Sequence, residues 1–193
     1  MLVFDIEIEK AIPNRREERR QGIEYCEGWG DHKNMGISVI GGMDTDGRSR
    51  VFLKDNFDAF IELVEKGETF VSFNGVNFDN KVINAVLGVS IPEENHIDLL
   101  RLIWVAEGLN PDTFSRAHGG YGLNAVVEAN IPHLSKTENG ALAPVLWQRG
   151  QYGKVIDYCL NDVYMTYALY NLIKERGCII NPKYPYKMIE IAL

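Results

Sequence analysis

Long apolar runs, paired cysteines and a surplus of positive charge are all missing from this sequence. No run approaches the roughly 18 apolar residues that a membrane-spanning helix needs, and the chain does not open with a basic segment leading into an apolar one. We therefore expect no membrane association and no export signal. The formal charge of −7 gives the surface as a whole no attraction for polyanions, although acids can be clustered to hold cations.

Cysteine and histidine are scarce as well. The three cysteines are odd in number and have no close pair, which argues against a disulfide framework and against a thiolate zinc site. The four histidines show no short ligand spacing, so a histidine-rich metal site is unsupported. A reducing, cytoplasmic setting fits this composition best.

The overall composition is that of a globular protein. Of 193 residues, 46% are hydrophobic and 24% are charged, close to the average of globular proteins. The length is that of one ordinary domain, so we expect a single domain spanning residues 1–193. Alternating polarity predicts a strand at residues 2–8, and the polar residues 9–34 are expected to form a long loop or insertion. Residues 178–193 are expected to form a C-terminal tail that is extended through residues 181–186.

Strands and helices alternate along the rest of the chain. Two β-rich runs at 36–42 and 49–54 flank an Asp-Gly hairpin signal, so the first three strands should be antiparallel neighbours. The further expected elements are a helix at 57–64, a strand at 69–73, a helix at 78–87, a strand at 97–99 and helices at 123–129 and 152–176. This alternation predicts an α/β layered fold.

The last of these helices has residues at helical spacing that we expect to form a buried stripe. These are Ile156, Leu160, Val163, Tyr167 and Tyr170.

Two acids stand side by side in the first predicted strand. Asp5 and Glu7 are two residues apart, so their side chains share a face at about 6.5 to 7 Å between Cα atoms. Carboxylates this close repel one another unless a cation lies between them or one takes a proton. An exposed strand face would explain the pair equally well.

Two further acids lie in separate segments. Asp79 follows the predicted strand 69–73 at the end where α/β sheets place ligands, although an acid at a helix start also suits the helix dipole. Asp162 lies among apolar residues of the long C-terminal helix, and Tyr158 stands one turn earlier on the same face. Together with the first-strand pair, these acids would suit Mg²⁺ or Mn²⁺, which prefer oxygen ligands.

Three short motifs carry a resemblance to a known family. They are FDIE at 4–7, SFNGVNFD at 72–79 and YCLND at 158–162. In order and spacing they resemble the three exonuclease motifs of the DEDD superfamily of 3′–5′ exonucleases, and the resemblance runs from residue 2 to about residue 173. Each motif alone is weak, but the three together, on a strand, a strand-to-helix turn and a helix, are specific.

The resemblance implies a fold, a cofactor and an activity. The fold is ribonuclease H-like, with a mixed five-stranded sheet flanked by α-helices. The cofactor is a pair of Mg²⁺ or Mn²⁺ ions bound by Asp5, Glu7, Asp79 and Asp162. The activity is hydrolysis of nucleic-acid phosphodiester bonds from the 3′ end, with release of nucleoside 5′-monophosphates.

The resemblance also implies a subgroup. The histidine branch of the family places His five residues before the last Asp, and here that residue is Asp157. Tyr158 instead matches the tyrosine branch, in which the hydroxyl orients the attacking water. An unperturbed tyrosine has a pKa of about 10, so Tyr158 is better suited to positioning by hydrogen bonds than to acting as a base.

Substrate contacts are implied at three positions. Asn74 matches the Asn of the second motif and Phe78 precedes its acid, although Asn74 beside a glycine is also an ordinary turn residue. Ile8 stands where the family commonly has Thr after Asp-x-Glu, so any hydroxyl contact to the terminal nucleotide is lost there. The implied partner is a single-stranded 3′ end, of DNA rather than RNA.

Several features allow two interpretations. The arginines between Arg15 and Arg20 could bind phosphates, or they could belong to a solvated helix face, since two glutamates interrupt them. Trp29, Tyr121 and Trp147 could stack on bases or pack in the core.

Function itself has an alternative interpretation. A catalytically silent ribonuclease H-like module that binds nucleic acid or protein would have the same fold. The presence of all four acids and the tyrosine favours the enzyme. An endonuclease of this fold is disfavoured by the Tyr158-to-Asp162 spacing. No pattern in the sequence indicates an oligomeric state.

Overall fold

The computed structural model describes residues 1–14, 18–134 and 140–193 of the chain. Its first half contains β1 (Leu2–Glu7), α1 (His32–Met35), β2 (Val39–Asp44), β3 (Ser49–Phe52), α2 (Phe57–Glu65), β4 (Phe70–Ser72), α3 (Asp79–Leu87) and η1 (Glu93–Asn95). Its second half contains β5 (His96–Asp98), α4 (Leu99–Ala106), η2 (Arg116–His118), α5 (Leu123–Asn130), η3 (Gly140–Leu142), α6 (Ala143–Gln148), α7 (Tyr152–Arg176), β6 (Cys178–Ile180) and β7 (Met188–Glu190).

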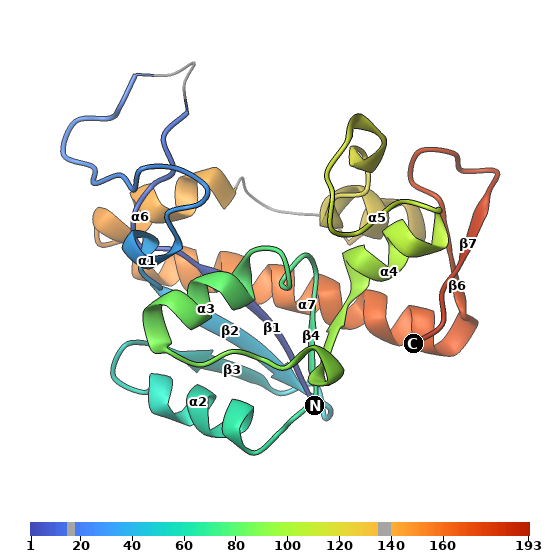
Figure 1. The fold of residues 1–193 in the computed structure, drawn as a ribbon, viewed down its shortest axis with the longest axis horizontal. Coiled ribbons are helices and arrows are strands. Elements are labelled where there is room, and N and C mark those ends of the chain that lie inside the picture. The colour runs from blue at the N-terminus through green and yellow to red at the C-terminus, as the bar shows by residue number, and fades with distance from the viewer. Residues whose placement is uncertain (15–17, 135–139) are drawn as a thin grey trace.

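A mixed five-stranded sheet forms the centre of the fold, with strand order β3-β2-β1-β4-β5 (Figure 1). β1, β2 and β3 are antiparallel neighbours, and β4 and β5 run parallel to β1. The predicted α/β fold and strand arrangement are therefore confirmed. Because β1, β4 and β5 are parallel, their carboxyl ends lie at one edge of the sheet.

The alternation of β1 separates the two faces of the sheet. One face packs against α2 and α3 in a cluster that contains Phe60 and Val82, and the β1 residues of this face are Leu2, Phe4 and Ile6. On the other face Val3 packs with Val163 of α7 (Figure 1). Asp5 and Glu7 alternate with Leu2, Phe4 and Ile6 along the strand, so they point to the face that is covered by α7.

α7 has the predicted bounds and ends at Gly177, whose φ of 68° closes the helix in the left-handed region. The predicted buried stripe is partly wrong, because Ile156, Leu160 and Tyr167 are only half-buried. α7 contacts β1 and β2 on one side and α5 and α6 on another. The fully buried residues of α7 are therefore spread over a broader face than a single stripe.

The C-terminal residues differ from the expected extended tail. β6 and β7 form an antiparallel two-stranded sheet, and Asn181–Lys187 form the turn between them. Ile179, Ile189 and Ile191 are buried in the cluster that covers the end of α7. The prediction missed this pairing because each strand is only three residues long, which leaves little alternation to detect.

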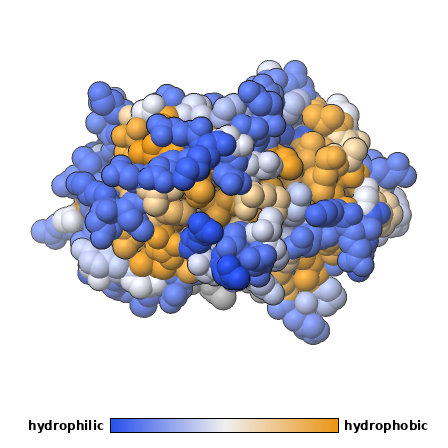
Figure 2. Space-filling view, turned by 90° about the horizontal axis from the view of Figure 1, so that it is seen from below, coloured by the Kyte–Doolittle hydropathy of each residue, from blue (hydrophilic) through white to orange (hydrophobic). Residues whose placement is uncertain are grey.

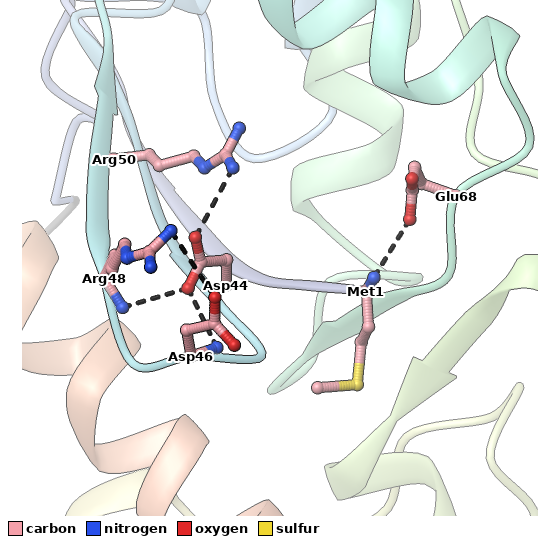
Figure 3. Close-up of polar contacts among 6 residues, drawn as sticks. All are labelled: Met1, Asp44, Asp46, Arg48, Arg50 and Glu68. Carbon is pink, nitrogen blue, oxygen red and sulfur yellow. Dashed lines mark hydrogen bonds and ion pairs between the residues drawn. The ribbon is translucent and has the colours of Figure 1, made fainter.

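The hairpin between β2 and β3 confirms the Asp-Gly turn signal. The Asp44 carboxylate accepts hydrogen bonds from the backbone N–H groups of Asp46 and Arg48, each at 3.0 Å, and lies 3.4 Å from Arg50 (Figure 3). The Met1 amino group forms an ion pair with Glu68 at 2.9 Å, which is drawn in Figure 3. The turn thereby fixes the register of the strand that pairs with β1.

The structure also bears on membrane-spanning helices and on the state of the cysteines. Within residues 1–14, 18–134 and 140–193, no helix is both long and apolar enough to cross a membrane. All three cysteines are free thiols, and Cys26 and Cys159 are buried.

Candidate active site

Acidic residues gather where the three parallel strands end. β1 carries Asp5 and Glu7 at its carboxyl end, and Asp98 closes β5. β4 leads through a turn into α3, whose first residue is Asp79. Because parallel strands end at the same edge of a sheet, these acids are brought to one place from distant parts of the chain.

Asp79 is bound directly to the first strand. Its carboxylate accepts a hydrogen bond of 3.1 Å from the backbone N–H of Ile6, between the two β1 acids. Only 5% of the residue is exposed. Burial raises the pKa of Asp79 to about 7, and the negative charges of Asp98 and Asp162 add to this increase. A carboxylate with such neighbours is a favourable place for a cation.

α7 approaches the sheet closely because β2 carries a glycine beneath it. A Cβ atom at Gly41 would lie 2.8 Å from Cys159 Sγ and 3.2 Å from a methyl carbon of Val163. Cys159 Sγ in turn lies 3.5 Å from the Asp5 carbonyl oxygen and 3.8 Å from its carboxylate. The neighbouring residues of α7 are therefore held over the acids of β1.

Tyr158 and Asp162 lie on this part of α7 and are both buried. Burial raises the pKa of Tyr158 well above its ordinary value, and the charges of Asp162 and Glu7, a hydrogen bond to Asp162 and the charge of Asp5 raise it further. The hydroxyl therefore stays protonated at neutral pH and works only through hydrogen bonds. The same charges, with burial as the largest cause, raise the pKa of Cys159, which makes that thiol unreactive.

The predicted acids are thus electrostatic neighbours, although they do not form a closed metal cage. In the described parts of the chain, no group of three or more His, Cys, Asp or Glu side chains is arranged to hold a metal ion. The donor set itself consists of carboxylates, which suits Mg²⁺ or Mn²⁺, and burial together with the charges of Asp98 and Asp162 raises the pKa of Asp79. The chemistry of the residues therefore fits a hard divalent cation.

Asp98 is a residue of the site that the sequence analysis missed. Its carboxylate accepts hydrogen bonds from the N–H groups of Asn74 at 2.9 Å and Val76 at 3.0 Å, which belong to the turn before Asp79. It also caps α4 by accepting from Leu100 and Arg101. An acid between a short strand and an apolar helix was the available signal, since Asp is a preferred N-cap residue.

The proposed substrate contacts lie beside these acids. Asn74 has a φ of 73°, a left-handed conformation that Asn tolerates better than most residues, so its turn role is observed. Phe78 is half-buried and its ring packs edge-on against that of Trp29, at 5.8 Å between centroids. Ile8 is buried in the core cluster beside α3.

The described residues between β1 and α1 have little regular structure apart from a bridge between Ala11 and Tyr25. Arg19 lies over the Tyr25 ring at 5.2 Å, and the Arg20 N–H donates to the Tyr25 hydroxyl. Residues 15–17 of the arginine cluster lie outside the described residues.

The three large aromatic residues that allowed two interpretations differ in their surroundings. Trp29 is 71% exposed, which leaves a ring face open to a ligand. Tyr121 is 2% exposed and belongs to the core, where its hydroxyl donates to Glu107. Trp147 is half-buried with its ring centroid 4.5 Å from that of Tyr152.

Replacing Asp98 with Asn should loosen the turn before Asp79. The amide can no longer accept at both positions, so one of the N–H groups of Asn74 and Val76 would lose its acceptor. We expect the free energy of unfolding to fall by about 1 to 2 kcal/mol in urea denaturation. Asp58→Asn, at an exposed acid of α2, is the control. Equal stability of both variants would contradict the role of Asp98.

Replacing Asp79 with Asn should stabilise the metal-free protein at alkaline pH. The folded-state pKa of about 7 exceeds the ordinary value of 3.8, so folding is favoured at low pH and this stabilisation is lost as pH rises from about 4 through 7. Asn retains an acceptor for the Ile6 N–H but carries no charge. We expect the variant to be more stable by on the order of 2 kcal/mol at pH 8 in EDTA, and by under about 1 kcal/mol at pH 4. A difference independent of pH would contradict this electrostatic account.

Two comparisons with known proteins found matches to this chain. The family model of the RNase_H superfamily matches residues 21–174. The structure is also similar to that of the family B DNA polymerase from the hyperthermophilic archaeon Pyrobaculum calidifontis, with a TM-score of 0.59 and 17% identity. The match covers 90% of this chain and 24% of the polymerase chain, so this chain spans about a quarter of that protein. No curated protein matches the chain significantly.

At 17% identity, the likeness to the polymerase concerns the fold. The family match is the stronger finding, because it covers well over half of the chain and includes the segments of Asp79, Tyr158 and Asp162. The mixed five-stranded sheet with helices on both faces agrees with it. The chain belongs to the RNase H superfamily.

Proposed function

We propose that this chain is a metal-dependent 3′–5′ exonuclease of the tyrosine-bearing DEDD type, with residues 1–193 as one exonuclease domain. The observation that supports this most directly is the placement of Tyr158. Its hydroxyl forms a hydrogen bond to Asp162 and lies in the field of the Glu7 and Asp5 charges. A buried tyrosine among carboxylates from a separate strand has no evident value for packing alone.

Asp5, Glu7, Asp79 and Asp162 are the residues proposed to hold two divalent ions. When bound, such ions supply Lewis acidity that lowers the pKa of a water and stabilises the departing 3′ oxygen. The residues themselves contribute oxygen donors and negative charge, and Glu7, Asp79 and Asp162 are buried.

Tyr158 is proposed to position the attacking water. Because its hydroxyl proton is directed at Asp162, the hydroxyl oxygen keeps a lone pair that can accept a hydrogen bond from water. Attack of this water on phosphorus breaks the bond to the 3′ oxygen, which takes a proton and remains on the shortened strand. The released product is a nucleoside 5′-monophosphate.

The terminal nucleotide is proposed to lie against the turn before α3. Asn74 and Phe78 are in that turn, and the exposed ring of Trp29 lies beside Phe78. Aromatic faces bind unpaired bases by stacking, without strong sequence preference. This arrangement favours a single-stranded 3′ end, and we propose DNA as the preferred strand.

A digestion series with 5′-labelled oligonucleotides tests the proposal. Single-stranded DNA, RNA and duplex are incubated with Mg²⁺, Mn²⁺ or EDTA. We expect a ladder of labelled products that shortens from the 3′ end, fastest on single-stranded DNA and absent in EDTA. Asp162→Asn protein, purified in parallel, controls for contaminating nucleases.

Circular single-stranded DNA supplies the discriminating substrate. An exonuclease leaves it intact because it has no 3′ end, whereas an endonuclease of the same superfamily would cut it. Cleavage of the circle would overturn the proposal. Binding of linear strands without any cleavage would instead favour the catalytically silent module.

A further inference from the structure

The turn between β6 and β7, residues Asn181–Lys187, displays aromatic side chains to solvent. Tyr186 is 89% exposed and Tyr184 is 46% exposed, and their ring centroids lie 6.1 Å apart. On the neighbouring η2 side, Phe114 is 80% exposed. Rings in such positions contribute little to the core, so their presence calls for another explanation.

This turn is held in shape by buried polar contacts. Asn181 is fully buried, and its side-chain oxygen accepts from the backbone N–H groups of Lys183 and Tyr184. Its amide donates to Glu107 at 2.8 Å, and Lys187 donates to the same carboxylate at 2.9 Å. The tyrosine backbone is therefore ordered before any ligand arrives, which reduces the entropy lost on binding.

Positive charge lies between the rings. The Lys183 ammonium donates to the carbonyl of Ala117 and stands 4.7 Å from the Tyr121 ring and 6.0 Å from the Tyr184 ring. Among the described residues, Lys187 pairs with Glu107 and no ion pair joins Lys183 to a carboxylate. Exposed Arg116 lies next to Ala117. In a chain of net charge −7, this is a local concentration of cations and aromatic rings.

We propose that this surface, made of Phe114, Arg116, Lys183, Tyr184 and Tyr186, binds single-stranded nucleic acid upstream of the 3′ end. The inference rests on the proposed function and deepens it by adding a second contact for the same strand. Stacking rings interspersed with cations are the features that bind single strands without sequence preference.

The position of the turn agrees with this role. In Figure 1 the turn lies at the upper right, whereas β1 runs upward and to the left, so the two proposed contacts are separated along the length of α7. The view from below in Figure 2 shows hydrophobic residues on the lower face of the molecule, away from the turn. A protein partner that buries apolar area would therefore find a more suitable face below than at the charged turn.

The length of α7 between the acids and β6 gives the scale of the strand that is needed. From Asp162 to the end of α7 at Arg176 the helix rises about 21 Å at 1.5 Å per residue. A stacked strand advances about 3.4 Å per nucleotide, so about six nucleotides span this distance. Oligonucleotides shorter than this should not reach the turn.

The test is a binding series in Asp162→Asn protein, which prevents digestion. Tyr184→Ala combined with Tyr186→Ala is compared with the parent protein by fluorescence anisotropy on labelled oligo-dT of 4 and 20 nucleotides. We expect Kd for the 20-mer to rise at least about tenfold and Kd for the 4-mer to stay unchanged. Lys183→Gln should reduce the salt dependence of 20-mer binding by about one phosphate contact.

Matched variants separate stacking from loss of fold. The double Tyr→Phe variant keeps both rings and should bind the 20-mer normally. Tyr164→Ala removes a ring of α7 that is about as exposed as Tyr184 and should have no effect. Circular dichroism checks that every variant is folded. Equal affinity of the double Ala variant for the 20-mer would overturn the inference, as would a self-association in sedimentation that the double variant abolishes.

Failure of this inference differs from failure of the proposed function. If the unsubstituted protein hydrolyses none of the substrates but the 20-mer binds in a way that depends on the two tyrosines, only the exonuclease proposal is rejected. Hydrolysis without any effect of the two tyrosines would reject only the second contact.

Discussion

Asp162→Asn is expected to lower the rate of phosphodiester hydrolysis by at least about 10³-fold while the protein stays folded. Asn has nearly the same size as Asp, so packing on the buried face of α7 is preserved. The substitution removes a negative ligand from the proposed ion site, whose charge stabilisation amounts to several kcal/mol, and each 1.36 kcal/mol corresponds to a factor of ten in rate. Single-turnover digestion of 5′-labelled oligonucleotide in Mg²⁺ measures the change.

The same substitution has an electrostatic consequence that does not depend on catalysis. The charge of Asp162 is one of the causes that raise the pKa of Asp79, so the pKa of Asp79 should fall toward its ordinary value in the variant. Asp157→Asn, at an exposed acid of the same helix, is the control and should leave hydrolysis intact. Full activity of Asp162→Asn would remove this residue from the site.

Tyr158→Phe is expected to lower turnover by about 10²-fold with little change in substrate affinity. The substitution deletes only the hydroxyl and retains the ring in its buried position. If the hydroxyl positions water, its loss affects the transition state far more than the bound substrate, so kcat falls and Kd does not. Pre-steady-state cleavage separates the two quantities.

Two observations sharpen this test. Because burial and neighbouring acids keep the Tyr158 hydroxyl protonated, the pH profile of hydrolysis by the unsubstituted protein should show no ionisation of Tyr158 between pH 6 and 10. Tyr164→Phe changes an exposed tyrosine of the same helix and controls for general effects. An unchanged rate in Tyr158→Phe would make Tyr158 a packing residue and would withdraw the tyrosine-branch mechanism, whatever the role of the acids.

Local patterns predicted the elements that have strong periodicity or strong end signals. The alternation of β1 placed Asp5 and Glu7 on one face, and the structure has that face toward α7. The bounds of α7 were predicted because its apolar spacing is long and Gly177 follows it. The order of the motifs then indicated which distant segments belong together.

Tertiary interactions explain what the sequence analysis missed. Asp98 supports the turn before Asp79 through hydrogen bonds to backbone N–H groups more than twenty residues away, and backbone groups carry no sequence signal. The β6–β7 pair depends on burial of Ile179 and Ile189 against the end of α7. Strands this short take their conformation from the surface on which they pack.

The absence of a side chain at Gly41 has a consequence for the choice of ion. Because Cys159 and Val163 leave no room for a methyl group there, contact of their side chains with the Gly41 backbone sets the gap between α7 and the sheet. Under the proposed function, the acids of β1 and those of α7 bind the ions from opposite sides of a gap, and this glycine sets the width of the gap. Mg²⁺ demands oxygen distances of about 2.0 to 2.1 Å, whereas Ca²⁺ takes about 2.3 to 2.6 Å. A methyl group at residue 41 would widen this gap and shift the preference of the metal site toward ions of larger radius.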